Sequence, residues 1–344
     1  MTCAHCYVSG GRDLPIAYDN FRAAIKRLRI IINGLDGEKY VTLGNEVFTH
    51  PKATQILTTV HEVLPEYSSY KAMGGGIPTT GIALLNRHDK NEVLRILKKM
   101  DCSGFDFSVL GGRTNHNALV KNSRAFDALV KFAQWTAEQN IALGINLIIS
   151  KPLIDDCYEI SAFVKQFPNA AVSPVIPIYL PVDRLRTFEQ YRAEQSDYLK
   201  LKDKLSELGI NKKQLLKTAH DHSEKSIFEA LEKNSFDYRE NETKQPLWTF
   251  FNITREYELY YGNAGAHTQK LGNILTDPPH KLLSLIQKLP SNYGWSAYYD
   301  INKLPPIDKL LLKISPLTTN YVYPSIQDCI YRWLDKCGSH NYII

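Results

Sequence analysis

Long apolar runs, a signal sequence and a strong charge of one sign are all missing from this sequence. No apolar run in its 344 residues approaches the length of about 20 that a membrane-spanning helix needs, and the first residues are polar and contain cysteine. Its 41 basic and 36 acidic residues are interspersed and leave a formal net charge of +5. We therefore expect a cytoplasmic protein, and neither a membrane nor a nucleic-acid partner is indicated.

Cysteine is also scarce, and its distribution argues against a disulfide framework. The chain has 6 cysteines, and none lies between Cys157 and Cys329. Cys102, Cys157, Cys329 and Cys337 are far apart, a spacing that suits reduced, buried thiols.

The remaining two cysteines, Cys3 and Cys6, lie near the start of the chain and are followed directly by Tyr7. A C-x-x-C pair on a loop directs two thiolates at one volume. This is the geometry that zinc, an iron–sulfur cluster or a redox disulfide requires. Plain surface thiols are the simplest alternative, but exposed free thiols are reactive and are generally avoided.

Helical and strand-like segments alternate over the first half of the chain. Apolar residues at helical spacing predict helices over 18–32, 53–64, 91–100, 123–139 and 155–167. Short apolar or β-branched segments predict strands over 39–43, 68–73, 105–110, 141–149 and 171–178. This alternation is typical of βαβ units, so we expect an α/β protein with a parallel sheet.

The second half has a different character. We predict charged, amphipathic helices over 188–208 and 213–233, a polar loop over 234–245, and strands within 247–261 and 270–274 joined by a turn at Gly262 and Asn263. Two further helices are predicted over 279–289 and 325–337. Soft boundaries near Pro181 and Gln245 divide the chain into residues 1–180, a helical connection over 181–245, and a C-terminal domain over 246–344.

The run His5-Cys6-Tyr7 resembles the end of the C-x-x-x-C-x-x-C motif of radical S-adenosylmethionine (SAM) enzymes. For residues 1–180 the resemblance implies a partial (β/α)6 TIM-like barrel with a 4Fe–4S cluster on the loop after the first strand. Cys3 and Cys6 would be the second and third cluster ligands, beside Tyr7. The first strand and the first cysteine would then precede Met1, so the motif is truncated in this sequence.

Three later segments resemble SAM-binding elements of the same family. Gly44, Asn45 and Glu46, followed by His50-Pro51, resemble its Gly-Gly-Glu-Pro segment, although Asn45 and Val47 depart from the pattern. The resemblance implies that the Glu46 carboxylate pairs with the SAM ammonium, while glycine allows close backbone approach.

The segment 107–112 resembles the turn after the fourth family strand, with Ser108 toward the SAM ribose but without the usual aspartate. The segment 145–149 resembles the next strand, with Asn146 toward the cofactor. Simpler interpretations remain: Glu46 is a solvated loop carboxylate, and Ser108 and Asn146 bind backbone groups. Arg113 and His116, after the fourth strand, are weaker candidates for substrate contact.

Residues 258–263 and 271–275 resemble the hairpins of a SPASM or twitch extension, which usually binds further clusters. With no cysteine between Cys157 and Cys329, we expect a metal-free version. The resemblance implies an iron–sulfur enzyme that cleaves SAM reductively and abstracts a substrate hydrogen. Its substrate would be a peptide or protein, and its electron donor an external flavodoxin- or ferredoxin-like protein. Two alternatives stay open: a cluster-free relative that acts as a binding scaffold, and a barrel stabilised by zinc.

The motif spacing leads to a test at the level of DNA. We expect a cysteine codon two positions upstream of Met1, because Cys3 and Cys6 fill the second and third positions of the motif. Sequencing the genomic DNA immediately before Met1 checks this, and a stop codon or another residue at that position would contradict it.

Overall fold

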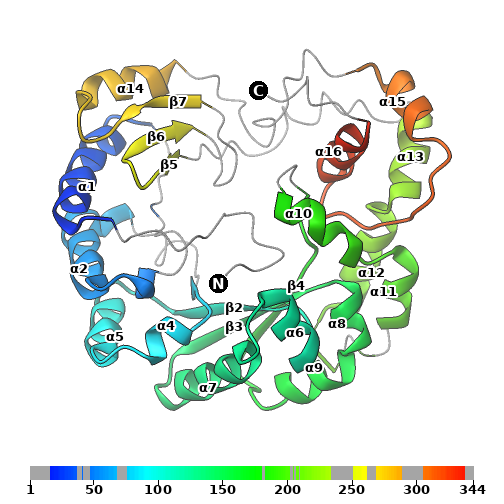
Figure 1. The fold of residues 1–344 in the computed structure, drawn as a ribbon, viewed down its shortest axis with the longest axis horizontal. Coiled ribbons are helices and arrows are strands. Elements are labelled where there is room, and N and C mark those ends of the chain that lie inside the picture. Colours follow the sequence, from blue (N-terminus) through cyan, green and yellow to red (C-terminus); the bar gives the residue numbers. More distant parts are fainter. Residues whose placement is uncertain are drawn as a thin grey trace.

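The computed structural model describes residues 16–36, 41, 47–67, 76–179, 183–201, 204, 207–208, 210–233, 251–261, 269–288 and 305–337. Their helices and strands follow one another around an open arc, with a parallel sheet at its base (Figure 1). No helix within these ranges is both long and apolar enough to cross a membrane.

The first three predicted helices are confirmed as α1 (Tyr18–Asn33), α2 (Ala53–Val63) and α5 (Lys90–Lys99). Each buries one apolar face, to which Ile25, Ile56 and Leu97 belong. Shorter helical turns lie between them: η1 (Val47–Thr49), η2 (Pro65–Tyr67) and α4 (Ile82–Leu85). Apart from residue 41, the strands predicted over 39–43 and 68–73 lie outside the described residues.

Four parallel strands form the sheet in the order β1 (Gly76–Pro78), β2 (Gly104–Val109), β3 (Ala142–Ile148) and β4 (Ala171–Val175). Helices α6 (Arg113–Val120) and α7 (Ala125–Glu138) join β2 to β3, and α8 (Lys151–Asp155) and α9 (Cys157–Val164) join β3 to β4. The predicted parallel α/β sheet is therefore confirmed. Helices α6 and α8 and strand β1 were not predicted.

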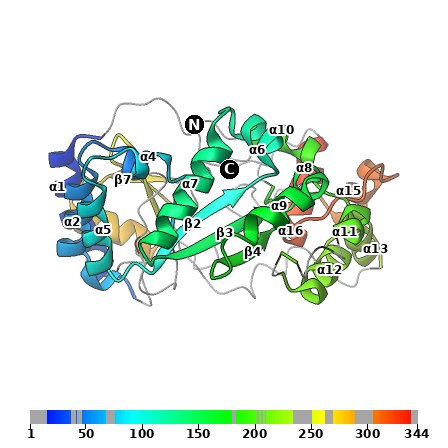
Figure 2. The ribbon, with the colours of Figure 1, turned by 90° about the horizontal axis from the view of Figure 1, so that it is seen from below.

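One face of the sheet is covered by aromatic packing. Phe105 and Phe107 of β2 contact Phe132 of α7, with ring centroids 5.2 and 6.5 Å apart, and Phe107 also contacts Phe163 of α9. Helices α7 and α9 lie over this outer face (Figure 2). Because side chains alternate along a strand, the residues between these phenylalanines face the inside of the arc.

The prediction of two long helices over 188–208 and 213–233 is wrong, because each region is divided into shorter helices. The first region contains α10 (Asp183–Phe188), the 3-10 helix η3 (Glu189–Tyr191) and α11 (Gln195–Leu201). The second contains α12 (Lys212–Asp221) and α13 (Glu224–Glu232). At the breaks the backbone pairs with distant segments: Arg192 with Ser150, and Ser223 with Val322. Helical periodicity carries no information about such partners.

The C-terminal strands form a second, antiparallel sheet of β5 (Phe251–Ile253), β6 (Glu258–Tyr261) and β7 (Gln269–Asn273). The helix α14 (Pro279–Gln287) follows it and packs on α1 (Figure 1). Leu259, Leu271 and Leu282 are buried here with Ala24 and Ile31 of α1. The Tyr257 hydroxyl also donates to the Ala17 carbonyl over 3.0 Å, so this module is attached to the N-terminal helix.

The last described helices, α15 (Ile307–Ile314) and α16 (Ile326–Lys336), pack against α13 around the fully buried Trp333 and Cys329. The connecting helices also reach the main core, where Tyr198 and Leu215 are buried among residues of the first half. The domain boundaries near 181 and 245 stay a prediction.

A buried carboxylate links α13 to α16. Glu224 has no exposed surface and accepts hydrogen bonds from Arg332 at 3.0 Å and from the Trp333 indole N–H at 3.1 Å. The backbone N–H of Tyr321 and the hydroxyl of Thr319 bind its other oxygen. Both oxygens are therefore satisfied, which offsets the cost of burying the charge.

We expect Glu224→Ala to destabilise the protein by about 3–5 kcal/mol, because it leaves the buried Arg332 guanidinium with only its longer, 3.8 Å contact to Glu189. Urea unfolding measures the change. Glu229→Ala, at an exposed position on the same helix, is the control and should stay within about 0.5 kcal/mol of the wild type. Equal effects of the two changes would show that the Glu224 network does not stabilise the fold.

Candidate functional site

Two predicted site residues, Ser108 and Asn146, are brought side by side by the strand register. Ser108 of β2 is paired with Asn146 of β3, and Asn146 is in turn paired with Ser173 of β4. All three have the strand parity opposite to Phe105 and Phe107, so they lie on the inner face of the sheet. Ser108 and Asn146 are partly exposed and Ser173 is exposed, so the row is open to a ligand.

The inner face below this row contains two glycines. Gly104 and Gly144 are strand neighbours of the row on the amino-terminal side. A Cβ at Gly104 would lie 2.2 Å from the Ala142 carbonyl oxygen, and a Cβ at Gly144 would lie 1.8 Å from a carboxylate oxygen of Asp106. A side chain at Gly104 would therefore clash with the strand backbone, and one at Gly144 would displace the Asp106 carboxylate, which fills the space over Gly144.

Asp106 is the inner-face residue that the sequence analysis missed. It lies on β2 two residues before Ser108, and its carboxylate lies over Gly144 and accepts a hydrogen bond from the Gly76 backbone N–H. Burial raises the pKa of Asp106, and the hydrogen bond from Gly76 opposes that shift. A signal was present in the sequence, because Asp106 is the only charged residue in the segment 104–109.

The turn after β2 is held by carboxylates from a neighbouring βα unit. The N–H of Gly112 and the side-chain amide of Asn115 donate to Asp156 at 2.7 and 2.8 Å, and the N–H of Arg113 donates to Glu159 at 2.9 Å. The acid that the resemblance would place in this turn is absent, and the acids beside it come from the α8–α9 region instead. They fix the start of α6 at the carboxyl end of β2.

A buried hydroxyl lies at the carboxyl end of β3. Ser150 follows Asn146 by four residues and has no exposed surface. Its side-chain oxygen has no hydrogen-bond partner among the described residues. Buried polar atoms are nearly always paired, so the Ser150 hydroxyl is an exception among the described residues.

His50 connects two stretches that flank the predicted cofactor-binding loops. Its Nε2 lies 2.9 Å from the Ile16 carbonyl oxygen, and its Nδ1 accepts from the Lys52 N–H at 2.9 Å. Arg87 donates to the carbonyls of Phe48 and His50, and its ion pair with Asp89 depresses the pKa of that carboxyl. Both nitrogens of His50 are thus engaged, and its role here is structural.

The remaining predicted site residues lie outside the part of the chain that the structure describes. They are Cys3, Cys6, Tyr7, Gly44, Asn45 and Glu46. Within the described ranges, no group of three or more His, Cys, Asp or Glu side chains is arranged to hold a metal ion.

The two weaker candidates for substrate contact have structural roles. His116 is only 3% exposed and accepts from the Leu110 N–H at 3.3 Å, and its ring packs edge-on against Phe126. Arg113 pairs with Asp127 on the outer surface and lies over the same Phe126 ring. Neither residue is part of the Ser108–Asn146 row.

Comparison with solved structures supports a known fold. Native anSMEcpe with bound AdoMet and Cp18Cys peptide matches with a TM-score of 0.52 and 11% identity, over 98% of this chain and 95% of that chain. Native anSMEcpe with bound AdoMet and Kp18Cys peptide has a TM-score of 0.51, 12% identity, and coverage of 98% and 96%. Hexahistidine-tagged anSMEcpe with bound AdoMet has a TM-score of 0.51, 12% identity, and coverage of 98% and 92%.

These structures are of an anaerobic sulfatase-maturating radical SAM enzyme. No family model and no curated protein sequence matches the chain. At 11–12% identity the likeness shows a shared fold, so the function has to be argued from the site.

The environment of Asp106 leads to a pH-dependent expectation. Because its folded pKa is raised above the ordinary value of about 4, its contribution to stability is complete below that value and is lost as the pH rises through the raised pKa. Asp106→Asn removes this loss, so the unfolding free energy of the variant relative to wild type should increase between about pH 4 and pH 7. Urea unfolding at both pH values measures the difference.

Asp308→Asn, at an exposed position of α15, is the control and should not reproduce this pH dependence. If Asp106→Asn has the same relative stability at both pH values, burial does not penalise the Asp106 carboxylate.

Proposed function

We propose that the protein is a radical SAM enzyme that cleaves SAM reductively and abstracts a hydrogen atom from a peptide or protein. The observation that carries the proposal is the alignment of Ser108 with Asn146 on the inner face of the parallel sheet. Among the residues that the sequence resemblance assigns to SAM, these two lie in the described part of the chain. They lie in a fold shared over 98% of the chain with structures that contain AdoMet.

The inner face is chemically suited to SAM. SAM carries ribose hydroxyls and an adenine, both of which need hydrogen-bonding partners in a site shielded from water. The Ser108 hydroxyl and the Asn146 amide supply both donors and acceptors.

The proposal assigns the cluster to the N-terminal loop. Cys3 and Cys6 would hold two irons of the 4Fe–4S cluster, Tyr7 would pack beside it, and Gly44, Asn45 and Glu46 would bind the methionine end of SAM. The contact of His50 with Ile16 supports this assignment, because it joins the residues that follow these two stretches. The bound cluster and SAM would supply the radical chemistry, with an electron from an external flavodoxin- or ferredoxin-like donor.

The chain's own residues would orient SAM and exclude water. Ser108 and Asn146 would position the nucleoside part of SAM, and Glu46 would position the ammonium group by a charge-assisted hydrogen bond. The aromatic packing behind β2 keeps the row rigid, since Phe105 and Phe107 are 1% and 2% exposed. A rigid row holds the ligand in one orientation.

A peptide substrate is proposed from the two neighbours that contain peptides. The module of β5–β7 and α14 would be a SPASM-like cover without clusters. Its attachment to α1 through Tyr257 and the buried leucines supports such a position at one end of the arc. The proposed location is cytoplasmic.

Anaerobic reconstitution of the protein expressed from its natural reading frame tests the proposal. We expect about four irons per chain, and conversion of SAM to 5′-deoxyadenosine and methionine with a chemical reductant. A Cys329→Ala/Cys337→Ala double variant should keep the same iron content. About eight irons, falling to about four in that variant, would show a second cluster. Bound zinc without iron would favour the structural-zinc alternative, and neither metal would favour the binding scaffold.

Substitutions of the proposed SAM contacts provide a sharper test. Each variant removes a hydrogen bond to SAM. Glu46→Gln, which removes a charged contact, should weaken SAM binding by roughly ten- to a hundredfold, and Asn146→Ala, which removes a neutral contact, should weaken it less. Iron content should not change. Gln134→Ala, an amide removed from the exposed face of α7, is the control. Unchanged SAM affinity in either variant would remove that residue from the site.

A further inference from the structure

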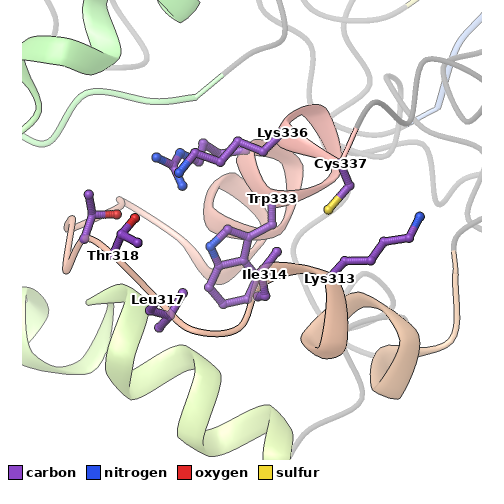
Figure 3. Close-up of a pocket in the computed structure, with 9 residues that line it drawn as sticks. Lys313, Ile314, Leu317, Thr318, Trp333, Lys336 and Cys337 are labelled. Atoms are coloured by element: carbon purple, nitrogen blue, oxygen red, sulfur yellow. The ribbon is translucent and has the colours of Figure 1, made fainter.

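A cavity of about 480 Å³ lies between the end of α15 and the last turns of α16, far along the chain from the Ser108–Asn146 row. Figure 3 shows the Trp333 indole between α16 and the segment that carries Ile314 and Leu317, with Lys336 and Cys337 on the last turn of α16. Its volume is in the range of sites that bind small ligands or one to two side chains.

The floor of the cavity is apolar. Ile314 and Leu317 are partly buried against the cluster around Trp333, which itself has no exposed surface. The indole N–H of Trp333 is already bound to Glu224, so it offers no polar contact to a ligand. An apolar side chain would bury its surface against Ile314 and Leu317.

The polar part of the lining is cationic. Arg332, Lys336 and Lys313 all line the cavity. The nearby anions are already paired: Glu224 is bound to Arg332, Trp333, Thr319 and the Tyr321 backbone, and Glu189 pairs with Arg192 and lies 3.8 Å from Arg332. Lys313 and Lys336 form no ion pair with any residue in the described part of the chain. The cavity therefore has surplus positive charge.

The environment of Lys336 agrees with this charge balance. Burial and the neighbouring Arg332 guanidinium lower the pKa of Lys336. A ligand carboxylate beside Lys336 would reduce the repulsion between the two cations, and the Thr318 hydroxyl in the same lining is a further donor.

We propose that this cavity binds an acidic peptide segment, with a glutamate or aspartate carboxylate at Lys336 and a neighbouring apolar side chain on Ile314 and Leu317. The proposal rests on the proposed function in taking a peptide as the substrate. The apolar floor distinguishes this ligand from a free inorganic anion, which needs only the cations. A nucleic acid is not favoured, because the only ring in the lining is buried and cannot stack on a base.

Peptide binding to the reconstituted protein tests the subsite. The probe is fluorescein-labelled acetyl-Ala-Leu-Glu-Leu-Glu-Ala-amide, and fluorescence anisotropy measures its affinity. Lys336→Gln should weaken binding by about tenfold or more, as expected for the loss of a charge-assisted hydrogen bond. Lys288→Gln, at an exposed position at the end of α14, is the matched control and should leave the affinity unchanged.

Two competitors identify the ligand chemistry. The same peptide with glutamine in place of glutamate should compete at least about tenfold less well, and inorganic phosphate should compete only weakly. Equal competition by the glutamine peptide, equal affinity of the Lys336→Gln and wild-type proteins, or no binding of the probe would each overturn the proposal. Strong competition by phosphate would show a site for free anions instead.

SAM cleavage measured on the same preparation separates the two proposals. Peptide binding that depends on Lys336 in a protein that does not cleave SAM would contradict the radical SAM function and leave the subsite standing. SAM cleavage with peptide binding that is independent of Lys336 would contradict the subsite alone.

Discussion

The packing of Phe105 and Phe107 against α7 and α9 is the interaction on which the candidate site depends. A strand buried on its outer face by large rings has only its alternate residues available for the inner face. The same contacts that stabilise the core therefore orient Ser108 inward, and the parallel register places Asn146 beside it. Loss of the aromatic layer would leave the inner row without a fixed geometry.

Buried charges have a comparable role in the second half. Arg192 is 1% exposed and donates to Glu189 and to the carbonyls of Pro177 and Val322, so one side chain joins three segments. Glu224 does the same for α13 and α16. Burying each of these charges is favourable only where all its partners are present. These networks therefore favour one arrangement of the connecting helices over others.

The low identity to structures of the same fold has a physical explanation. A parallel sheet covered by helices requires apolar residues where the helices pack, and many sequences satisfy that pattern. Function depends instead on a few residues at the carboxyl ends of the strands. The turn after Ser108 is itself held by hydrogen bonds from the backbone N–H groups of Gly112 and Arg113 to Asp156 and Glu159.

The sequence by itself determined helices α1, α2, α5, α7 and α9 and strands β2, β3 and β4, because periodicity and strand composition are local properties. It also placed Ser108 and Asn146 on neighbouring strands. Only the tertiary structure decided that Asp106 faces inward over Gly144, since the inner face is defined by where the helices pack. The breaks at Arg192 and Ser223 were likewise decided by Ser150 and Val322, whose distance in sequence hides them from any local pattern.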